Sequence, residues 1–224
     1  MTTLKRYLKS FTDYLYKGEV GDVGYFETTL YGLGLRPEVA TQLKTVSPYV
    51  MPDLDQLKQL PQGTLGYEYA QYMDRYGLQV AKISDDLLEE AKQQPFALRY
   101  ILIHDLFHTL LGFDTSYAGE LGVQGFITGQ NYSRALHLTG PLVQLITMLI
   151  RPLQARAISR NFRQGKALGQ QAHCVLTFPF EQNWARPIQA IRKELNLPQV
   201  SHSLSSQPAV PSLKTVGWKG EASA

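Results

Sequence analysis

The segment from residue 101 to residue 120 sets four side chains that could bind a metal among apolar neighbours: His104, Asp105, His108 and Glu120. His104 and His108 are four residues apart, so on a helix both imidazoles project from one face, with Cβ atoms about 5–6 Å apart. This spacing lets two ring nitrogens reach one metal ion at about 2.0–2.1 Å. Asp105 borders the same face, because it precedes His108 by three residues. The pattern predicts a divalent metal site.

Glu120 can reach this site because the helix is expected to end before it. Gly112 is typical of a helix C-terminus, and the cluster at residues 114–116 is expected to cap a second helix. The second helix can then fold back and offer the Glu120 carboxylate. Two imidazoles and two carboxylates make a plausible first shell for zinc, iron or manganese, and magnesium is a further possibility.

From the residues alone, a second interpretation is equally open. A histidine on an apolar helix is more often a hydrogen-bonded core residue, and a Glu in the first turns of a helix can simply complement the helix dipole. His137, His173 and His202 have no comparable neighbours in the sequence, and we expect them to be structural.

Helical periodicity dominates the chain, which predicts an all-α fold in a single multi-helix domain over residues 1–197. Cys174–Phe180 is the best strand candidate, and Pro179 limits it to a short or edge strand. Residues 198–224, rich in Ser and containing Pro, are expected to form a flexible tail. The expected helices span residues 2–16 and 37–45, begin after Asp53, Thr64 and Ser84, and continue over 95–112, 117–129, 141–165 and 181–195.

Composition excludes several classes of protein. A net charge of +3 is too mild to indicate nucleic-acid binding. Cys174 is the single cysteine, so an internal disulfide framework and a CxxC motif are excluded. The N-terminal stretch lacks the apolar run of a secretory signal. The apolar stretch Leu136–Leu153, interrupted by Pro141, falls short of the about 20 residues needed to span a bilayer. We therefore expect a soluble or peripheral protein.

Charge is distributed unevenly along the chain. No Asp or Glu occurs between Glu120 and Glu181, whereas Arg156, Arg160 and Arg163 lie in that interval and share one helical face. Such a face suits an anionic membrane surface or a prenyl phosphate headgroup, and a plain solvated basic face is the alternative.

Apolar residues of the same region could line a slot for an isoprenoid chain, in which each buried methylene contributes about 0.8 kcal/mol. Ordinary core packing is the alternative for each of them. The candidate lining residues are Val123, Phe126, Ile127, Leu142, Leu145, Ile146 and Leu149.

The segment HDLFHTLLGFDTSYAGE resembles the His-Asp-x-x-His-x11-Glu signature of the ubiquinone (coenzyme Q) biosynthesis protein four family, with all four signature positions filled. LKQLPQGTLGYEY at Leu57–Tyr69 and CVLTFPFEQNW at Cys174–Trp184 resemble two further segments of that family. The resemblance extends over roughly residues 25–197, and the Ser-rich tail is the main departure.

The resemblance implies a mostly helical fold, a bound metal commonly thought to be zinc, and a hydrophobic channel for a prenyl tail. Members associate with membranes, organise other quinone-synthesis enzymes and have been linked to oxidative removal of the C1 carboxyl of a prenylated ring. By position, His104, Asp105, His108 and Glu120 would be the metal ligands or their neighbours, with His104 and Asp105 in catalytic roles. Instead of binding the metal, Asp105 could act as a base or orient an imidazole.

Three functions follow as hypotheses. The first is a quinone-biosynthesis protein that binds a prenylated lipid and a divalent metal, and carries out C1 decarboxylation. The second is a non-catalytic lipid-binding scaffold, and the third a metal-dependent hydrolase of prenyl phosphates. Expected partners are a prenylated quinone precursor or isoprenoid lipid, a membrane surface, other quinone-biosynthesis enzymes and a second copy of the chain, but no nucleic acid. The expected location is cytoplasmic, on the inner membrane face, or at the mitochondrial inner membrane in a eukaryote.

Overall fold

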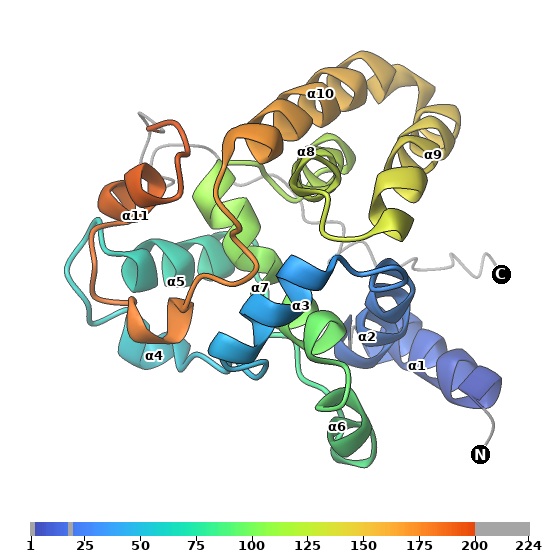
Figure 1. Cartoon of the computed structure of the whole chain (residues 1–224), viewed down its shortest axis with the longest axis horizontal. Coiled ribbons are helices and arrows are strands. Elements are labelled where there is room, and N and C mark those ends of the chain that lie inside the picture. The colour runs from blue at the N-terminus through green and yellow to red at the C-terminus, as the bar shows by residue number, and fades with distance from the viewer. Residues whose placement is uncertain (1–2, 18–19, 200–224) are drawn as a thin grey trace, which may run out of the picture.

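The computed structural model describes residues 3–17 and 20–199 and is all-α, as predicted. Figure 1 shows the arrangement of its helices. The helices, with short 3-10 turns marked η, are α1 (Thr3–Lys17), α2 (Val20–Tyr31), α3 (Pro37–Gln42), η1 (Leu43–Thr45), α4 (Leu54–Leu57), α5 (Leu65–Arg75), α6 (Asp85–Ala91), α7 (Pro95–Leu111), α8 (Tyr117–Gln130), α9 (Arg134–Ile150), η2 (Pro152–Gln154), α10 (Ala155–Gln171), η3 (Phe180–Gln182) and α11 (Ile188–Glu194).

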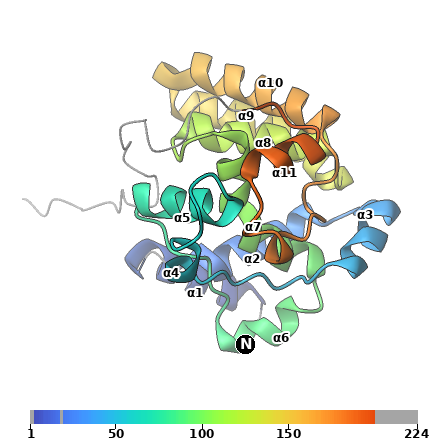
Figure 2. The ribbon, with the colours of Figure 1, turned by 90° about the vertical axis from the view of Figure 1, so that its left-hand side faces the viewer.

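Helix α7 lies at the centre of the molecule. Figures 1 and 2 show α8, α9 and α10 together at one end of the molecule and α1 and α2 toward the other. Of the 17 residues of α7, 14 are buried, so it is covered on nearly all sides. A helix that is apolar all round is stable only in such a buried position. His104 and His108 are therefore held on the most enclosed helix of the fold.

Helices α8 and α10 pack with their backbones in close contact. A Cβ atom at Gly165 would lie 1.9 Å from the carbonyl oxygen of Gly122, and one at Gly125 would lie 2.2 Å from that of Phe162. Only glycine fits at such an approach. This packing fixes α8, which carries Glu120, against the rest of the fold.

Several predicted helix starts are confirmed. The Asp53 carboxylate accepts hydrogen bonds from Asp55 and Gln56 at the start of α4, and the Thr64 hydroxyl accepts one from Tyr67 at the start of α5. Ser84 also precedes a helix, α6, but its hydroxyl donates to Asp86 instead of capping a backbone amide.

The prediction of a helix over 141–165 is wrong at its start and in its middle. Helix α9 begins at Arg134, capped by the Ser133 hydroxyl, which accepts from the Leu136 amide at 3.1 Å. Pro141 lies inside this helix, and the chain turns at Arg151 before α10. The helix begins before the proline because the Ser133 side chain caps it there. Pro141 is tolerated inside the helix, where it removes only one backbone hydrogen-bond donor.

The strand prediction for Cys174–Phe180 is also wrong, because the segment forms turns. Its carbonyl groups are bound by a buried arginine instead of a neighbouring strand. The guanidinium of Arg99, on α7, donates to the carbonyl oxygens of Leu176, at 2.6 Å, and of Phe178. Burial lowers the pKa of Arg99.

The expected helix over 181–195 is shorter in the structure. It consists of η3 and α11, and Pro187 directly precedes α11. Between them the carbonyl groups of Trp184 and Arg186 accept hydrogen bonds from Gly66 and Leu65 at the start of α5. These tertiary bonds replace the missing helical turns.

Among the described residues, no single helix is long and apolar enough to cross a membrane, although the bent pair Arg134–Ile150 and Pro152–Gln171, at 116°, meets the length and composition criteria jointly. The predicted tail falls almost wholly outside the described residues, which end at residue 199.

Candidate metal centre

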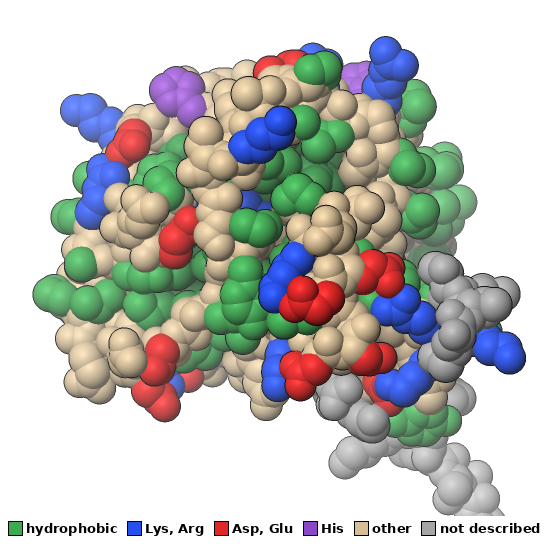
Figure 3. Space-filling view, turned by 60° about the horizontal axis from the view of Figure 1, so that its bottom comes forward, with side chains coloured by type: hydrophobic (Ala, Val, Ile, Leu, Met, Phe, Trp, Pro, Cys, Tyr) green, Lys and Arg blue, Asp and Glu red, His purple; other side chains and the backbone are tan. Residues whose placement is uncertain are grey.

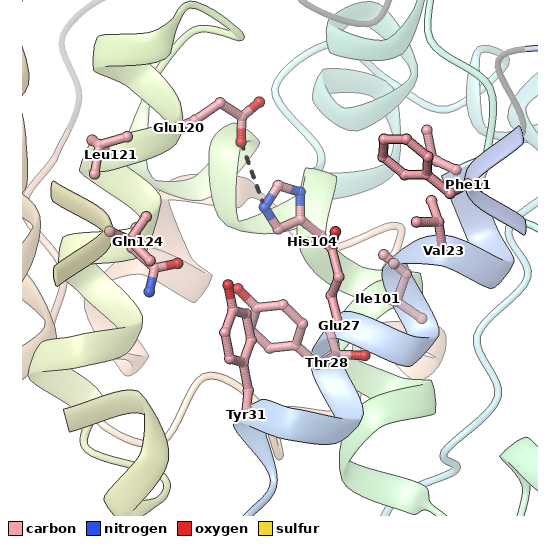
Figure 4. Close-up of a pocket in the computed structure, with 14 residues that line it drawn as sticks. Phe11, Val23, Glu27, Thr28, Tyr31, Ile101, His104, Glu120, Leu121 and Gln124 are labelled. Carbon is pink, nitrogen blue, oxygen red and sulfur yellow. Dashed lines mark ion pairs between the residues drawn. The ribbon is translucent and has the colours of Figure 1, made fainter. Parts of the chain in front are cut away.

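Three of the four signature side chains converge on one point. The Nε2 atom of His108 lies 3.3 Å from the Oε2 atom of Glu120, and the Nε2 atom of His104 lies 3.7 Å from the same oxygen. One nitrogen from each histidine and one oxygen of Glu120 all lie within 4.8 Å of one another. Figure 4 shows Glu120, on α8, directed at the His104 ring on α7.

The turn between α7 and α8 brings these groups together. Gly112 ends α7 in the left-handed conformation, with φ 77°, and its amide donates to the carbonyl oxygen of His108 at 2.8 Å. Arg192, on α11, donates to the carbonyl oxygens of Thr109 at 3.0 Å and Leu110 at 2.9 Å, which secures the last turn. Burial lowers the pKa of Arg192 to about 10.

Helix α8 then begins as the sequence predicted. The Ser116 hydroxyl accepts from the Gly119 amide at 3.1 Å, and the Asp114 carboxylate accepts from the Ser116 amide at 3.1 Å. Glu120 consequently falls in the first turn of α8, where the helix dipole favours an ionised carboxylate.

The Nδ1 atoms of His104 and His108, the ring nitrogens that do not face Glu120, lie near oxygen atoms. The Nδ1 atom of His108 lies 3.2 Å from the carbonyl oxygen of Phe113, a hydrogen bond in which Nδ1 donates and which leaves the Nε2 lone pair facing Glu120. The Tyr72 ring stacks on His108 at 5.8 Å between centroids. The Oδ1 atom of Asp105 lies 3.6 Å from the Nδ1 atom of His104, on the side of the ring away from Glu120.

The donor set fits a zinc-sized ion. With bonds of about 2.0–2.1 Å, two ligands of a tetrahedral ion are about 3.3–3.4 Å apart. The distances of 3.3 and 3.7 Å from the Glu120 oxygen to the two histidines are close to that spacing. The structure therefore contains a candidate His–His–Glu metal-binding group. Asp105, predicted as a fourth ligand, is not part of this group.

A cavity of about 360 Å³ opens beside the group, between α2, α7 and α8. Its wall includes Val23 and Ile101 and is more apolar than polar. Among the described residues that line it there is no Lys or Arg, and the polar side chains include Glu27, Tyr31, His104, Glu120 and Gln124. Figure 4 shows these side chains around one space.

The seven predicted lipid-lining residues do not gather at this cavity. Val123, Phe126 and Ile127 are buried in the main core. The other four lie on α9 and are largely exposed: Leu142 at 54%, Leu145 at 54%, Ile146 at 46% and Leu149 at 72%. Val143, between them, does line the cavity.

The three predicted basic residues do share an exposed face. Arg156, Arg160 and Arg163 are exposed on α10, and α10 contains no acidic residue. Whether this face meets a membrane stays a prediction.

Sequence reasoning missed the α2 wall of the cavity and the buried arginines. No motif marked Glu27, Tyr31 or Gln124, although Gln124 follows Glu120 by four residues and so shares its helix face. The sequence does contain a weak signal for Arg99 and Arg192. An arginine within an apolar helix pattern indicates a buried guanidinium, which requires hydrogen-bond acceptors around it.

The fold and the site define an all-helical protein with a candidate His–His–Glu metal-binding group at the edge of an apolar cavity. Residues 35–201 match the sequence model of the family described as "Coenzyme Q (ubiquinone) biosynthesis protein Coq4". The chain belongs to this family.

Curated relatives include the proteins named "Ubiquinone biosynthesis protein COQ4 homolog, mitochondrial" from Mus musculus, at 31% identity over 157 residues, and from Homo sapiens, at 30% over 151 residues. In both cases the match covers 65% of this chain and 54% of the relative. The chain thus spans about half the length of the curated relatives it matches.

A crystal structure of a proposed ubiquinone biosynthesis protein from Nostoc punctiforme is similar in fold. It superposes with a TM-score of 0.58 at 20% identity and covers 89% of this chain and 100% of the other. At this identity the likeness shows the fold alone.

Proposed function

We propose that the chain binds a divalent metal through His104, His108 and Glu120 and uses it to act on a prenylated ring in quinone biosynthesis. The observation that carries this proposal is the convergence of the three candidate ligand side chains, of which His104 and Glu120 line a largely apolar cavity. The relatives' names link the family to ubiquinone synthesis. The reaction we assign is oxidative removal of the ring's C1 carboxyl: the C1–carboxyl bond breaks and CO2 leaves, a C1–hydroxyl forms with an oxygen atom from water, and two electrons and two protons pass to an external two-electron acceptor. Zinc is our first candidate, and magnesium, iron and manganese are alternatives.

A bound metal would supply Lewis acidity toward the carboxylate or hydroxyl of the ring. The protein's own residues would hold and orient the reacting groups. Asp105 lies beside the Nδ1 atom of His104, so it would fix the direction of that imidazole. Tyr100 and Ile101 cover the cavity wall and would exclude water from the ring.

The prenyl phosphate hydrolase is the weaker alternative. A phosphate in this cavity would rely on the metal alone, because no lining residue among those described is Lys or Arg. Phosphate sites usually include an arginine or lysine that pairs with the oxygens. The same site is consistent with the scaffold hypothesis, in which the metal has only a structural role. An experiment must therefore distinguish a catalyst from a scaffold.

Replacement of Asp105 with asparagine separates catalysis from scaffolding. In cells lacking the native protein, we expect the variant to restore less than about a tenth of wild-type quinone and the carboxylated ring precursor to accumulate, since a misdirected ligand commonly costs about 10–100-fold in activity. Quinone content is measured by mass spectrometry. The matched control is Asp55→Asn at a 94% exposed side chain. Full restoration by Asp105→Asn, with normal metal and lipid content, would establish the scaffold instead.

The second element of the proposal is attachment to an anionic membrane through α9 and α10. The exposed apolar side chains of α9 lie next to the acid-free, arginine-bearing α10, and Leu153, at the turn between them, is 101% exposed. In contrast, α1 and α6 mix both signs, as in the ion pairs Arg6–Glu90 and Lys92–Glu89. Figure 3 shows acidic and basic side chains side by side on the face at the bottom of Figure 1.

This attachment predicts that the double variant Arg156→Ser, Arg160→Ser binds vesicles of phosphatidylcholine with 30% phosphatidylglycerol roughly thirtyfold more weakly, because each arginine contributes about 1 kcal/mol near an anionic surface. Vesicle co-sedimentation measures the change. The control Lys9→Ser, Lys92→Ser removes two lysines that are paired with acids. Equal loss in both double variants would contradict the assigned face.

We place the attached protein on the inner face of the membrane. In a eukaryote this would be the mitochondrial inner membrane, since the relatives' names include the word mitochondrial. There it would meet the other quinone-biosynthesis enzymes. A homodimer remains a prediction.

A further inference from the structure

A second hollow lies at the start of α9. It encloses about 460 Å³, and its lining residues are Arg36, Asn131, Arg134, His137 and Leu138. None of these residues lines the cavity beside the metal-binding group. Two arginines and a histidine thus border one space, and no Asp or Glu lines it in the described part of the chain.

Backbone hydrogen bonds between two distant segments bring the two arginines to this hollow. The amide of Arg36 donates to the carbonyl oxygen of Tyr132 at 3.0 Å, and the amide of Arg134 donates to that of Gly34 at 3.1 Å. The same segments form an isolated antiparallel bridge. Figure 1 shows the start of α9 beside the segment between α2 and α3. The positions of both arginines are therefore fixed by the backbone, while their side chains are exposed.

The positive charge of the hollow is only partly neutralised. Arg36 pairs with Glu38 at 3.5 Å, in an ion pair whose two side chains are both exposed. Helix α9, which carries Arg134 and His137, contains no Asp or Glu, and no ion pair joins Arg134 to any described acid. Guanidinium groups bind phosphate oxygens through paired, charge-assisted hydrogen bonds. The hollow therefore suits a phosphate group.

An apolar surface begins where the hollow ends. Leu138, which lines the hollow, is 74% exposed and is the first of four exposed leucines at intervals of four, three and four residues on α9. This spacing places them on one face of the helix. The other three are Leu142, Leu145 and Leu149. A continuous exposed apolar patch marks a surface that binds a partner or a membrane.

We propose that the hollow binds the phosphate of a single anionic phospholipid, whose acyl chains lie along the four exposed leucines of α9. Arg36 and Arg134 hold the phosphate oxygens. The inference rests on the proposed attachment of α9 and α10 to a membrane, and it adds a headgroup site separate from the arginines of α10. An acidic protein segment fits less well, because it would pair with the arginines and leave the leucines uncovered.

Monomeric lipid distinguishes a binding site from general attraction to a charged surface. The probes are dihexanoyl-phosphatidylglycerol, used below its critical micelle concentration, and glycerophosphoglycerol, which is the same headgroup without acyl chains. By isothermal titration calorimetry on the full chain, we expect one lipid per chain. The lipid should bind at least about tenfold more tightly than the bare headgroup, because each buried methylene raises affinity about fourfold.

Three single variants test the assigned contacts. Arg36→Gln and Arg134→Gln should each weaken lipid binding about tenfold, through the loss of hydrogen bonds to a charged group. Leu138→Ser should weaken binding of the lipid and leave that of the bare headgroup unchanged. The matched control is Arg156→Gln, at an exposed position of α10, which should keep the wild-type affinity for monomeric lipid. Circular dichroism shows that each variant keeps its fold.

Several results would overturn the lipid site. Absence of lipid binding would do so, as would equal losses in Arg134→Gln and Arg156→Gln. Equal affinity for lipid and bare headgroup would indicate a site for a free phosphate instead, and tighter binding of hexaglutamate would indicate an acidic protein segment. Each of these results leaves the proposed membrane attachment standing, because vesicle co-sedimentation tests it separately. Failure of the wild-type chain to bind vesicles would overturn the attachment and this inference together.

Discussion

Replacing His104 or Glu120 with alanine is expected to abolish metal binding. The wild-type chain should hold about one zinc ion, whereas the zinc affinity of each variant should fall more than about a hundredfold. The binding free energy of a structural zinc site is about 10–16 kcal/mol and comes from all of its ligands, so the loss of one of three ligands removes a large share of it. The Glu120 oxygen faces both imidazoles, at 3.3 and 3.7 Å, and Glu120 is the one carboxylate of this group among the described residues. Elemental analysis after exhaustive dialysis measures bound metal per chain.

The control for this loss is His137→Ala, at an exposed histidine on α9. It should keep the wild-type metal content. Both site variants retaining the same metal as the control would refute the His–His–Glu site, and circular dichroism of each variant shows whether the fold persists.

The convergence of His104, His108 and Glu120 could be predicted from the sequence because its geometry is local, whereas Asp105 falls outside the group. The spacing of His104 and His108 fixes their common face, and Gly112 with Ser116 fixes where α7 ends and α8 begins. Helix capping and hydrophobic periodicity depend on a few adjacent residues, so they can be recognised in the sequence without knowledge of the tertiary structure. The position of Glu120 followed from the same signals.

The cavity could not be predicted in this way, because it is formed by helices distant in sequence. Its α2 wall depends on how α2 packs against α7, and α8 is placed by backbone contact with α10 at Gly125 and Gly165. The surroundings of the seven candidate lipid-lining residues on α8 and α9 could not be predicted for a similar reason. Apolar residues at helical spacing can face a core, a cavity or solvent, and only the tertiary packing decides among them.

Replacing Arg99 with methionine is expected to destabilise the fold by about 3–5 kcal/mol, the usual cost of removing one member of a buried charged network. Arg99 is 0% exposed and donates to the carbonyl oxygens of Ser47, Leu176 and Phe178. Methionine fills a similar volume but leaves these carbonyl groups and the Glu181 carboxylate, 3.4 Å from Arg99, without their donor. Urea unfolding monitored by circular dichroism measures the change in the free energy of unfolding.

The matched control is Arg36→Met, whose side chain is 46% exposed and pairs with Glu38 at the surface. It should change the free energy of unfolding by less than about 0.5 kcal/mol, as exposed ion pairs do. A loss in Arg99→Met as small as that of the control would show that the 174–181 segment does not depend on α7.

The central claim is that His104, His108 and Glu120 together bind one metal ion, and X-ray absorption spectroscopy of the zinc-loaded full chain tests it most directly. We predict a first shell of nitrogen and oxygen at about 2.0–2.1 Å with the outer-shell scattering of two imidazoles. His104→Ala, prepared and dialysed in the same way, should show no zinc absorption edge above background, because it loses the metal. A wild-type spectrum without imidazole scattering, or one that His104→Ala leaves unchanged, would contradict the claim.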